Sequence, residues 1–216
     1  MPHPWLTTMR LYVLLTQEHC RIPIFDAAQQ VIRGGADVVQ LREKRMSDPQ
    51  ILDLGRRLRD MTAKAGVGFV INDRADLARL LDADGVHLGQ TDLPPAAARR
   101  MLKPGQIIGL STHSLDQARA ALAAGVDYIG VGPVYPTATK GYAEGVGLEY
   151  IRSAAAIPLP LVAIGGITLD RAPAVAAACP PGRCAIAVCS AILSSPDIES
   201  ATAAFKSALR LSPPAT

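Results

Sequence analysis

Short apolar runs alternate along the chain with longer segments whose apolar residues are spaced three or four apart. Runs of four to six apolar residues bounded by glycine or proline are typical of strands buried on both faces, whereas the wider spacing is typical of amphipathic helices. The pattern predicts strands at residues 10–15, 37–42, 68–71, 85–88, 107–110, 128–131, 161–164 and 185–188. It predicts helices at residues 25–33, 47–66, 75–81, 94–102, 115–124, 170–178 and 198–209.

Eight strands that alternate with helices in a chain of 216 residues favour an α/β fold of the (β/α)8 barrel type, formed by a single domain. We expect the barrel to span residues 10–210. Residues 1–9 are expected to be a loose segment because of Pro2 and Pro4, and residues 211–216 a proline-containing tail. Catalytic residues of such barrels come from the carboxyl ends of the strands.

The composition narrows the class of partner. The chain has 22 basic and 19 acidic residues, a balance that argues against a nucleic-acid or membrane-surface patch and leaves homo-oligomerisation open. Its longest mainly apolar run, residues 154–167, is interrupted by Pro158 and Pro160 and is too short to span a bilayer. The opening residues lack the cleavage pattern of a signal peptide. We therefore expect a cytoplasmic protein that acts on small molecules.

The four cysteines are Cys20, Cys179, Cys184 and Cys189. They have no CxxC spacing and lie among residues typical of a core. We expect reduced, partly buried thiols, as is usual in the cytosol, and neither a zinc site nor a disulfide framework.

Three polar side chains share one face at the end of the second predicted strand. Because side chains alternate along a strand, Gln40, Arg42 and Lys44 point to the barrel interior while Leu41 and Glu43 point toward the helices. Cations inside a barrel are costly unless they meet an anion. Internal carboxylates are one such anion, but a bound polyanion is the better interpretation.

The ends of the third and fourth predicted strands carry Asp73 and Asp92. These carboxylates come from neighbouring strands and lie beside the cations of the second, a combination that favours Mg²⁺ bound together with a diphosphate. The alternative for Asp73 is that it caps the helix that begins near Ala75.

Thr137, Thr139 and Lys140 follow the sixth strand and supply hydroxyls and a charge suited to an anion such as a phosphate. Lys140 belongs with the first, charged site; the alternative is that this stretch is an ordinary polar surface loop. The last two strand ends predict a second anion site. Gly165 and Gly166 follow the seventh strand, and Ser190 follows the eighth, where such barrels bind phosphate through backbone N–H groups. His87 and His113 also lie near strand ends, but a single histidine there is more often structural than catalytic.

Taken together and in this order, the motifs QLREK, INDR, DGVHLGQTD, GLSTHS, GVGPVYPTATK, AIGGI and VCSAI resemble those of the thiamine phosphate synthase family. The resemblance runs from residue 10 to about residue 209. It implies a transferase of thiamine biosynthesis that couples 4-amino-2-methyl-5-hydroxymethylpyrimidine diphosphate with a thiazole phosphate, with or without a carboxylate. The products would be thiamine monophosphate and pyrophosphate, formed by a dissociative, Mg²⁺-assisted substitution.

Carried over by position, the family pattern assigns roles to individual residues. It implies that the pyrimidine diphosphate binds Gln40, Arg42, Lys44, Asn72, Ser111 and Lys140, of which Arg42, Lys44 and Lys140 also assist catalysis. It implies Mg²⁺ on Asp73 and Asp92. It places the thiazole phosphate on Thr137, Thr139, Gly166, Cys189 and Ser190.

The chain departs from the family pattern at two places. Cys189 stands where the family more often has valine or isoleucine, and no proline follows Lys140 directly. Two other functions stay open: a thiazole tautomerase of the same fold with His113 as its base, and a non-catalytic thiazole phosphate sensor. Neither would use the full diphosphate and metal set, so its presence favours the synthase.

Overall fold

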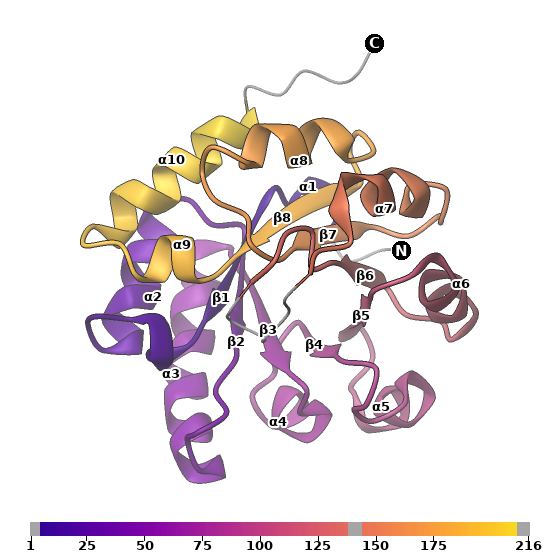
Figure 1. The fold of residues 1–216 in the computed structure, drawn as a ribbon. Coiled ribbons are helices and arrows are strands. Elements are labelled where there is room, and N and C mark those ends of the chain that lie inside the picture. Colours follow the sequence, from indigo (N-terminus) through magenta and orange to yellow (C-terminus); the bar gives the residue numbers. More distant parts are fainter. Residues whose placement is uncertain (1–4, 138–143, 211–216) are drawn as a thin grey trace.

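In the computed structural model, which describes residues 5–137 and 144–210, eight parallel strands form a closed barrel inside a ring of helices (Figure 1). Each strand pairs with the next in sequence, and the last pairs with the first. This arrangement confirms the predicted (β/α)8 fold. The strands are β1 (Leu11–Leu15), β2 (Val38–Leu41), β3 (Gly68–Asn72), β4 (Gly85–Leu88), β5 (Ile107–Thr112), β6 (Tyr128–Val131), β7 (Leu161–Ile164) and β8 (Cys184–Val188).

The helices that cover the barrel follow the predicted positions closely, with one main addition. The pattern of apolar residues gave no indication of α7, whose eight residues begin at a glycine and bury only Tyr150, Ile151 and Ala154. The helices are α2 (Ile24–Arg33), α3 (Asp48–Ala65), α4 (Ala75–Leu80), α5 (Pro95–Met101), α6 (Leu115–Ala123), α7 (Gly147–Ala154), α8 (Ala172–Ala178), α9 (Ser190–Leu193) and α10 (Ile198–Arg210), with the 3-10 turn η1 (Gln17–His19) after β1.

Local sequence signals fix the longest helix, α3. Ser47 and Gln50 form a capping box at its start, where Pro49 occupies the first turn. Gly66 ends the helix in the left-handed conformation, with a φ of 67°, which glycine adopts without steric cost. Both ends lie within a residue or two of the predicted bounds.

Side chains alternate between two cores along each strand. Val39 and Leu41 belong to the large core between barrel and helices, whereas Val38 packs inside the barrel with Tyr12 and Tyr128. A Cβ at Gly109 would lie 2.1 Å from the Tyr128 ring, so the glycine makes room for this phenol in the barrel centre. The barrel interior is therefore filled by side chains and is not a pore.

The start of the chain differs from the expected loose segment. Residues Trp5–Thr8 form helix α1, and both Leu6 and Met9 are buried in the same cluster as the barrel interior. The Trp5 ring packs edge-on against Tyr128 at 6.4 Å between centroids. The expectation was wrong for residues 5–9. It rested on the two early prolines and did not consider the apolar contacts that residues 5–9 make with the barrel interior. Residues 1–4 and 211–216 lie outside the described part of the chain.

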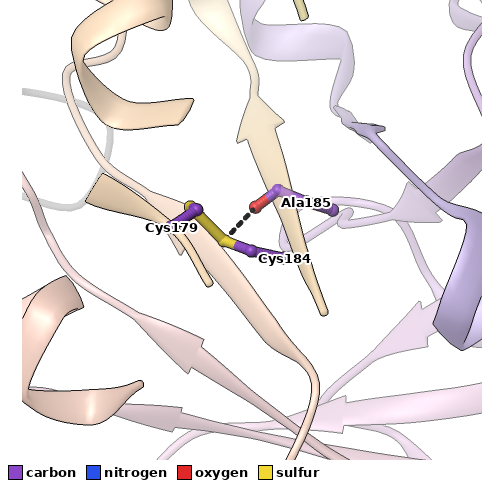
Figure 2. Close-up of a disulfide and its surroundings, with 3 residues drawn as sticks. All are labelled: Cys179, Cys184 and Ala185. Carbon is purple, nitrogen blue, oxygen red and sulfur yellow. Dashed lines mark hydrogen bonds between the residues drawn. A yellow bond between two sulfur atoms is a disulfide. The ribbon is translucent and has the colours of Figure 1, made fainter. Parts of the chain in front are cut away.

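A disulfide joins Cys179 and Cys184, so the expectation of reduced thiols is wrong for this pair (Figure 2). Cys179 directly follows α8, and Cys184 is the first residue of β8. A turn at Gly182, with a φ of 72°, brings the two Cα atoms to 5.7 Å, a separation that a disulfide spans. Reduced thiols were predicted because the cysteines lack CxxC spacing, a criterion that does not take this turn into account. The disulfide lies at the amino end of β8, opposite the strand ends that carry the predicted site.

Among the described residues, no helix combines the length and apolar character needed to cross a membrane.

Candidate active site

A cavity of about 550 Å³ lies over the carboxyl ends of the later strands. Its walls come mainly from the segments that follow β5, β6, β7 and β8, with Glu18 and His19 added from the turn after β1. Of the predicted site residues, those that line the cavity are Ser111, Thr137, Gly166, Cys189 and Ser190. These include every described residue of the predicted thiazole phosphate set. Thr139 and Lys140 lie outside the described residues.

The loop after β7 is held against the loop after β6. Backbone N–H groups of Val134 and Tyr135 donate to the carbonyls of Ile164 and Gly165 at 2.8 and 3.0 Å. Gly166 has a φ of 62°, and a Cβ there would lie 2.5 Å from the carbonyl oxygen of Pro136. This close approach of two loops, together with the left-handed backbone, is the reason that glycine is needed at this position.

Arg171 is a residue of this wall that the sequence analysis missed. Its Nη1 donates to the carbonyl of Gly166 at 2.9 Å, and its guanidinium lies 4.6 Å from the ring centroid of Tyr135. It also lines the cavity. Arg171 therefore ties the two loops together and brings a cation to a side of the mouth where the other described ligands are neutral. Its position just before α8 made it resemble an ordinary residue of a helix start.

The predicted cationic residues of the second strand lie on the opposite side of the mouth. Gln40 and Arg42 are only 2% and 9% exposed, and the hydrogen bond from Gln40 to Tyr12 places Gln40 on the predicted interior face. Arg42 and Lys44 line a separate hollow of about 330 Å³ beside the turn after β1. Lys44 Nζ lies 3.7 Å from Asp73 Oδ2. The structure thus places Lys44 beside one of the two predicted metal ligands, outside the larger cavity.

The two predicted metal ligands follow neighbouring strands, β3 and β4. Asp73 adopts a φ of 63°, and its N–H donates to the carbonyl of His87 at 2.8 Å. Arg74, not Asp73, directly precedes α4, so Asp73 is not at the N-cap position that the alternative interpretation requires. Asp92 Oδ2 accepts from the N–H of Gly89 at 2.6 Å. Asn72, at the end of β3, pairs in register with His87 of β4.

Arg74 fixes the backbone that carries Asp73. Its guanidinium bridges Asp48, at the start of α3, and Asp76, in α4, with N–O distances of 2.8 and 2.6 Å. Hydrogen bonds from Arg74 hold the pKa of both carboxyls below their ordinary value. No group of three or more histidine, cysteine or acidic side chains suited to a metal occurs in the described ranges.

A continuous chain of hydrogen-bonded side chains lies beneath the cavity. Gln40 Nε2 donates to the Tyr12 hydroxyl at 2.8 Å, and the Tyr12 and Tyr128 hydroxyls lie 3.3 Å apart. The Tyr128 hydroxyl lies 3.0 Å from His87 Nδ1, and His87 Nε2 lies 2.9 Å from Ser111 Oγ. Burial raises the pKa of both tyrosines, so both phenols are neutral at physiological pH. The sequence analysis missed both tyrosines because they resemble core aromatics.

His113 lines the cavity at the end of β5. Its Nδ1 contacts the carbonyl oxygen of Gly132, and its backbone N–H donates to Gln117 at 2.7 Å. In a neutral ring, Nδ1 therefore carries the proton and Nε2 the lone pair.

Comparisons with known proteins agree on one family. The sequence profile of the family described as "Thiamine monophosphate synthase" matches residues 11–192. The chain is 41% identical over 194 residues to the thiamine-phosphate synthase of Moorella thermoacetica, covering 88% of this chain and 91% of that protein. It is 39% identical over 203 residues to the enzyme of the same name from Shouchella clausii, covering 93% and 96%.

A solved structure gives the same result. The thiamine phosphate pyrophosphorylase of Pyrococcus furiosus superposes with a TM-score of 0.86 at 34% identity, over 94% of this chain and 96% of that one.

Proposed function

The chain belongs to the thiamine monophosphate synthase family, and we propose that it couples an aminopyrimidine methyl diphosphate with a thiazole phosphate to give thiamine monophosphate and pyrophosphate. It is a transferase of thiamine biosynthesis. The observation that carries the assignment of substrates is the cavity of about 550 Å³, which gathers Ser111, Thr137, Gly166, Cys189 and Ser190 from four different strand ends.

We propose that the reaction is a substitution at the methylene carbon of the pyrimidine. The C–O bond to the diphosphate breaks, its electron pair leaves with pyrophosphate, and the thiazole nitrogen donates its lone pair to the carbon that remains. The protein has no bond of its own to make. Its work is to hold the two substrates in reacting geometry and to stabilise the negative charge that develops on the leaving oxygen.

The cationic side of the mouth is suited to the diphosphate. Arg42 is buried at the carboxyl end of β2, and Lys44 follows it on the same face. Their charges, with that of Lys140, offset the charge of the leaving pyrophosphate. Gln40, Asn72 and Ser111 supply the polar contacts to the rest of the pyrimidine substrate.

Asp73 and Asp92 are the residues that would hold Mg²⁺. Within the described ranges no larger group of acidic or metal-binding side chains occurs, and a pair of carboxylates fits a metal that takes its remaining ligands from phosphate oxygens and water. Lys44, 3.7 Å from Asp73, keeps a positive charge beside this carboxylate. The ion would supply additional charge neutralisation to the leaving pyrophosphate.

The opposite side is suited to the thiazole phosphate. Gly166 and the Cys189–Ser190 pair line the cavity, and backbone N–H groups in such loops bind phosphate in barrels of this kind. Thr137 and Thr139 add hydroxyl groups. A contact through the backbone at residue 189 would make the cysteine side chain itself unimportant.

We further propose that the enzyme works in the cytoplasm on these small molecules, without nucleic-acid or membrane partners. Its near balance of charge argues against a patch for either surface. The cysteines no longer contribute to this argument, because two of them form a disulfide.

The proposal is tested by incubating the folded protein with both substrates and Mg²⁺ and following both products. Thiamine phosphate and pyrophosphate should appear in equal amounts, and neither should form when one substrate is left out. Rearrangement of a thiazole phosphate without coupling would indicate the tautomerase that uses His113. Binding without any turnover would indicate a sensor.

A further inference from the structure

The hydrogen-bonded chain beneath the cavity crosses the barrel from one predicted substrate ligand to another. It begins at Gln40 of β2, passes through Tyr12, Tyr128 and His87, and ends at Ser111 of β5. All its side-chain contacts lie between 2.8 and 3.3 Å. The three middle members do not belong to any substrate-binding set described above. Their connection of two proposed ligands suggests a role beyond packing.

The hydrogen bonds of the chain are all donated in one direction, from Gln40 toward Ser111. Gln40 Nε2 is a donor only, so the Tyr12 hydroxyl accepts from it and has one proton left to give. That proton goes to the Tyr128 hydroxyl, whose own proton goes to His87 Nδ1. The neutral imidazole then carries its proton on Nε2 and donates to Ser111 Oγ. Each member of this series gives one hydrogen bond to the next.

The two ends of the chain therefore offer opposite hydrogen-bonding groups, a donor at Ser111 and an acceptor at Gln40. Ser111 accepts from His87 and keeps its hydroxyl proton available as a donor. Gln40 has committed its amide nitrogen to Tyr12, and its Oε1 is buried with no hydrogen-bond partner among the described residues. An unpaired buried carbonyl oxygen is unfavourable, so the site is incomplete without a donor there.

The two ends line adjoining spaces that share part of their walls. Ser111 lines the large cavity, while Gln40 lines a hollow of about 10 Å³ immediately beneath it. Leu14, Gly130 and Ile164 belong to the walls of both. The hollow is close to the volume that one water molecule needs, which is also the size of a single amino group.

We infer that Tyr12, Tyr128 and His87 are positioning residues that set the direction of this chain, and thereby make the site selective for an aminopyrimidine over an oxopyrimidine. The exocyclic amine of the substrate donates to Gln40 Oε1, and a ring nitrogen or phosphate oxygen of the same substrate accepts from Ser111. This inference rests on the proposed function for the identity of the ring. An oxo group in place of the amine would set two acceptors against each other at Gln40.

The direction of the chain has a spectroscopic signature that needs no substrate. It requires the neutral His87 ring to be protonated on Nε2, which ¹⁵N chemical shifts of labelled histidine report directly. His87→Gln identifies the resonance among those of the four histidines. A wild-type His87 protonated on Nδ1 would overturn the inference.

Gln40→Glu tests whether the far end controls the ring. An ionised carboxylate accepts only, so Tyr12 must donate to it, Tyr128 must donate to Tyr12, and His87 must donate from Nδ1. The proton on His87 should therefore move from Nε2 to Nδ1 at about pH 9, where even a buried carboxyl ionises. The ¹³C shift of the new carboxyl confirms its charge. An unchanged His87 proton in this variant, once that carboxyl is ionised, would overturn the inference.

A kinetic comparison tests the selectivity and does not depend on Gln40. Tyr128→Phe breaks the chain and should raise the KM of the aminopyrimidine substrate about tenfold while leaving the thiazole phosphate KM unchanged. It should also narrow the preference for the amino over the oxo substrate. Tyr150→Phe is the matched control, because it removes a buried hydroxyl that bonds Thr112 and Ser114 outside the chain. The control should change neither KM.

The outcomes separate this inference from the proposed function. Movement of the His87 proton in Gln40→Glu, together with a wild-type protein that forms no thiamine phosphate, would support the chain and contradict the synthase assignment. Normal turnover with equal effects of Tyr128→Phe and Tyr150→Phe would leave the synthase intact and overturn the role of the chain.

Discussion

The two sides of the barrel mouth, which we propose bind two different anions, offer different groups. The side formed by β2, β3 and β4 carries Arg42, Lys44 and two aspartates, with Lys44 Nζ at 3.7 Å from Asp73. The side formed by β6, β7 and β8 presents glycine, threonine and serine, with Arg171 bound to the loop at its edge. The first side offers mainly charged side chains. The second side offers mainly neutral groups on a backbone of fixed geometry.

This difference in chemical groups indicates which substrate anion each side is suited to bind. A departing pyrophosphate gains charge during the reaction, so it is served by cations and a metal whose attraction grows toward the transition state. In the proposed mechanism the thiazole phosphate only has to be held, and neutral donors in a rigid loop would do this without competing for the metal. Variants of the first side should therefore act on turnover, and variants of the second side on one KM.

The largest effect is expected at the metal ligands. Asp92→Asn should lower kcat by about 10²- to 10³-fold, because it removes a charge that, as we propose, holds Mg²⁺ against the leaving group. The amide oxygen of asparagine keeps an acceptor for the N–H of Gly89, so the unfolding free energy should change by less than about 1 kcal/mol. Steady-state kinetics over a range of Mg²⁺ concentrations and thermal unfolding check both expectations. Full activity of the variant in EDTA would remove the metal from the account.

The next effect is expected at Lys140, which lies outside the described residues. Lys140→Ala should lower kcat by about 10²-fold with a smaller change in the pyrimidine diphosphate KM, since its attraction to the leaving oxygen strengthens as the C–O bond breaks. Lys140→Arg should restore only part of the rate, because the planar guanidinium does not replace a compact ammonium. Steady-state kinetics on both variants check this, and an unchanged kcat with a raised KM would mean that Lys140 only tethers the substrate.

A smaller and more selective effect is expected at Gly166. Gly166→Ala should raise the thiazole phosphate KM about tenfold and leave the pyrimidine KM unchanged, because the new Cβ meets the Pro136 carbonyl at 2.5 Å and displaces the loop. Gly66→Ala is the matched control. The φ of Gly66, 67°, is close to the 62° of Gly166, but a Cβ built at Gly66 would meet no atom of the described residues within 4 Å. Both variants carry backbone strain, so only Gly166→Ala should alter a KM. Equal kinetics of the two would contradict a phosphate site in this loop.

The smallest effect is expected at His113. An ionisation mechanism needs no base there, so His113→Ala should keep the coupling rate within a few fold, about 1 kcal/mol in activation free energy. A tautomerase would lose about 10²-fold or more with its general base. Parallel assays of coupling and of thiazole rearrangement check this. Collapse of the coupling rate in a folded variant would shift the account toward a base-driven step.

Local pattern was sufficient for most of the fold. Strands β4, β6 and β7 have the predicted bounds, and the capping signals of α3 placed its ends. Helix α7 was missed because it begins at a glycine and its apolar face is short. Two features depend on contacts that only the folded barrel forms. They are the regular, partly buried structure of residues 5–9 and the Cys179–Cys184 disulfide. Periodicity along the chain does not report such contacts.

The candidate site was predictable where strand ends and side-chain alternation determine it. Gln40 lies on the interior face as alternation requires, where it bonds Tyr12, and Gly166 and Ser190 reach one cavity. Arg171 was missed because its role depends on a loop from another strand. Tyr12 and Tyr128 were missed for a similar reason: only the closed barrel brings their hydroxyls, from β1 and β6, to 3.3 Å.

The division of labour between the two sides is tested most directly by calorimetric titration of each substrate alone, with Mg²⁺ and with EDTA. The pyrimidine diphosphate, or an analogue that does not ionise, should lose most of its affinity in EDTA and at high salt, because charge and metal hold it. The thiazole phosphate should bind almost equally with and without Mg²⁺, and Gly166→Ala should weaken only this ligand. Equal dependence of both ligands on Mg²⁺ would contradict the assignment of the two anion sites.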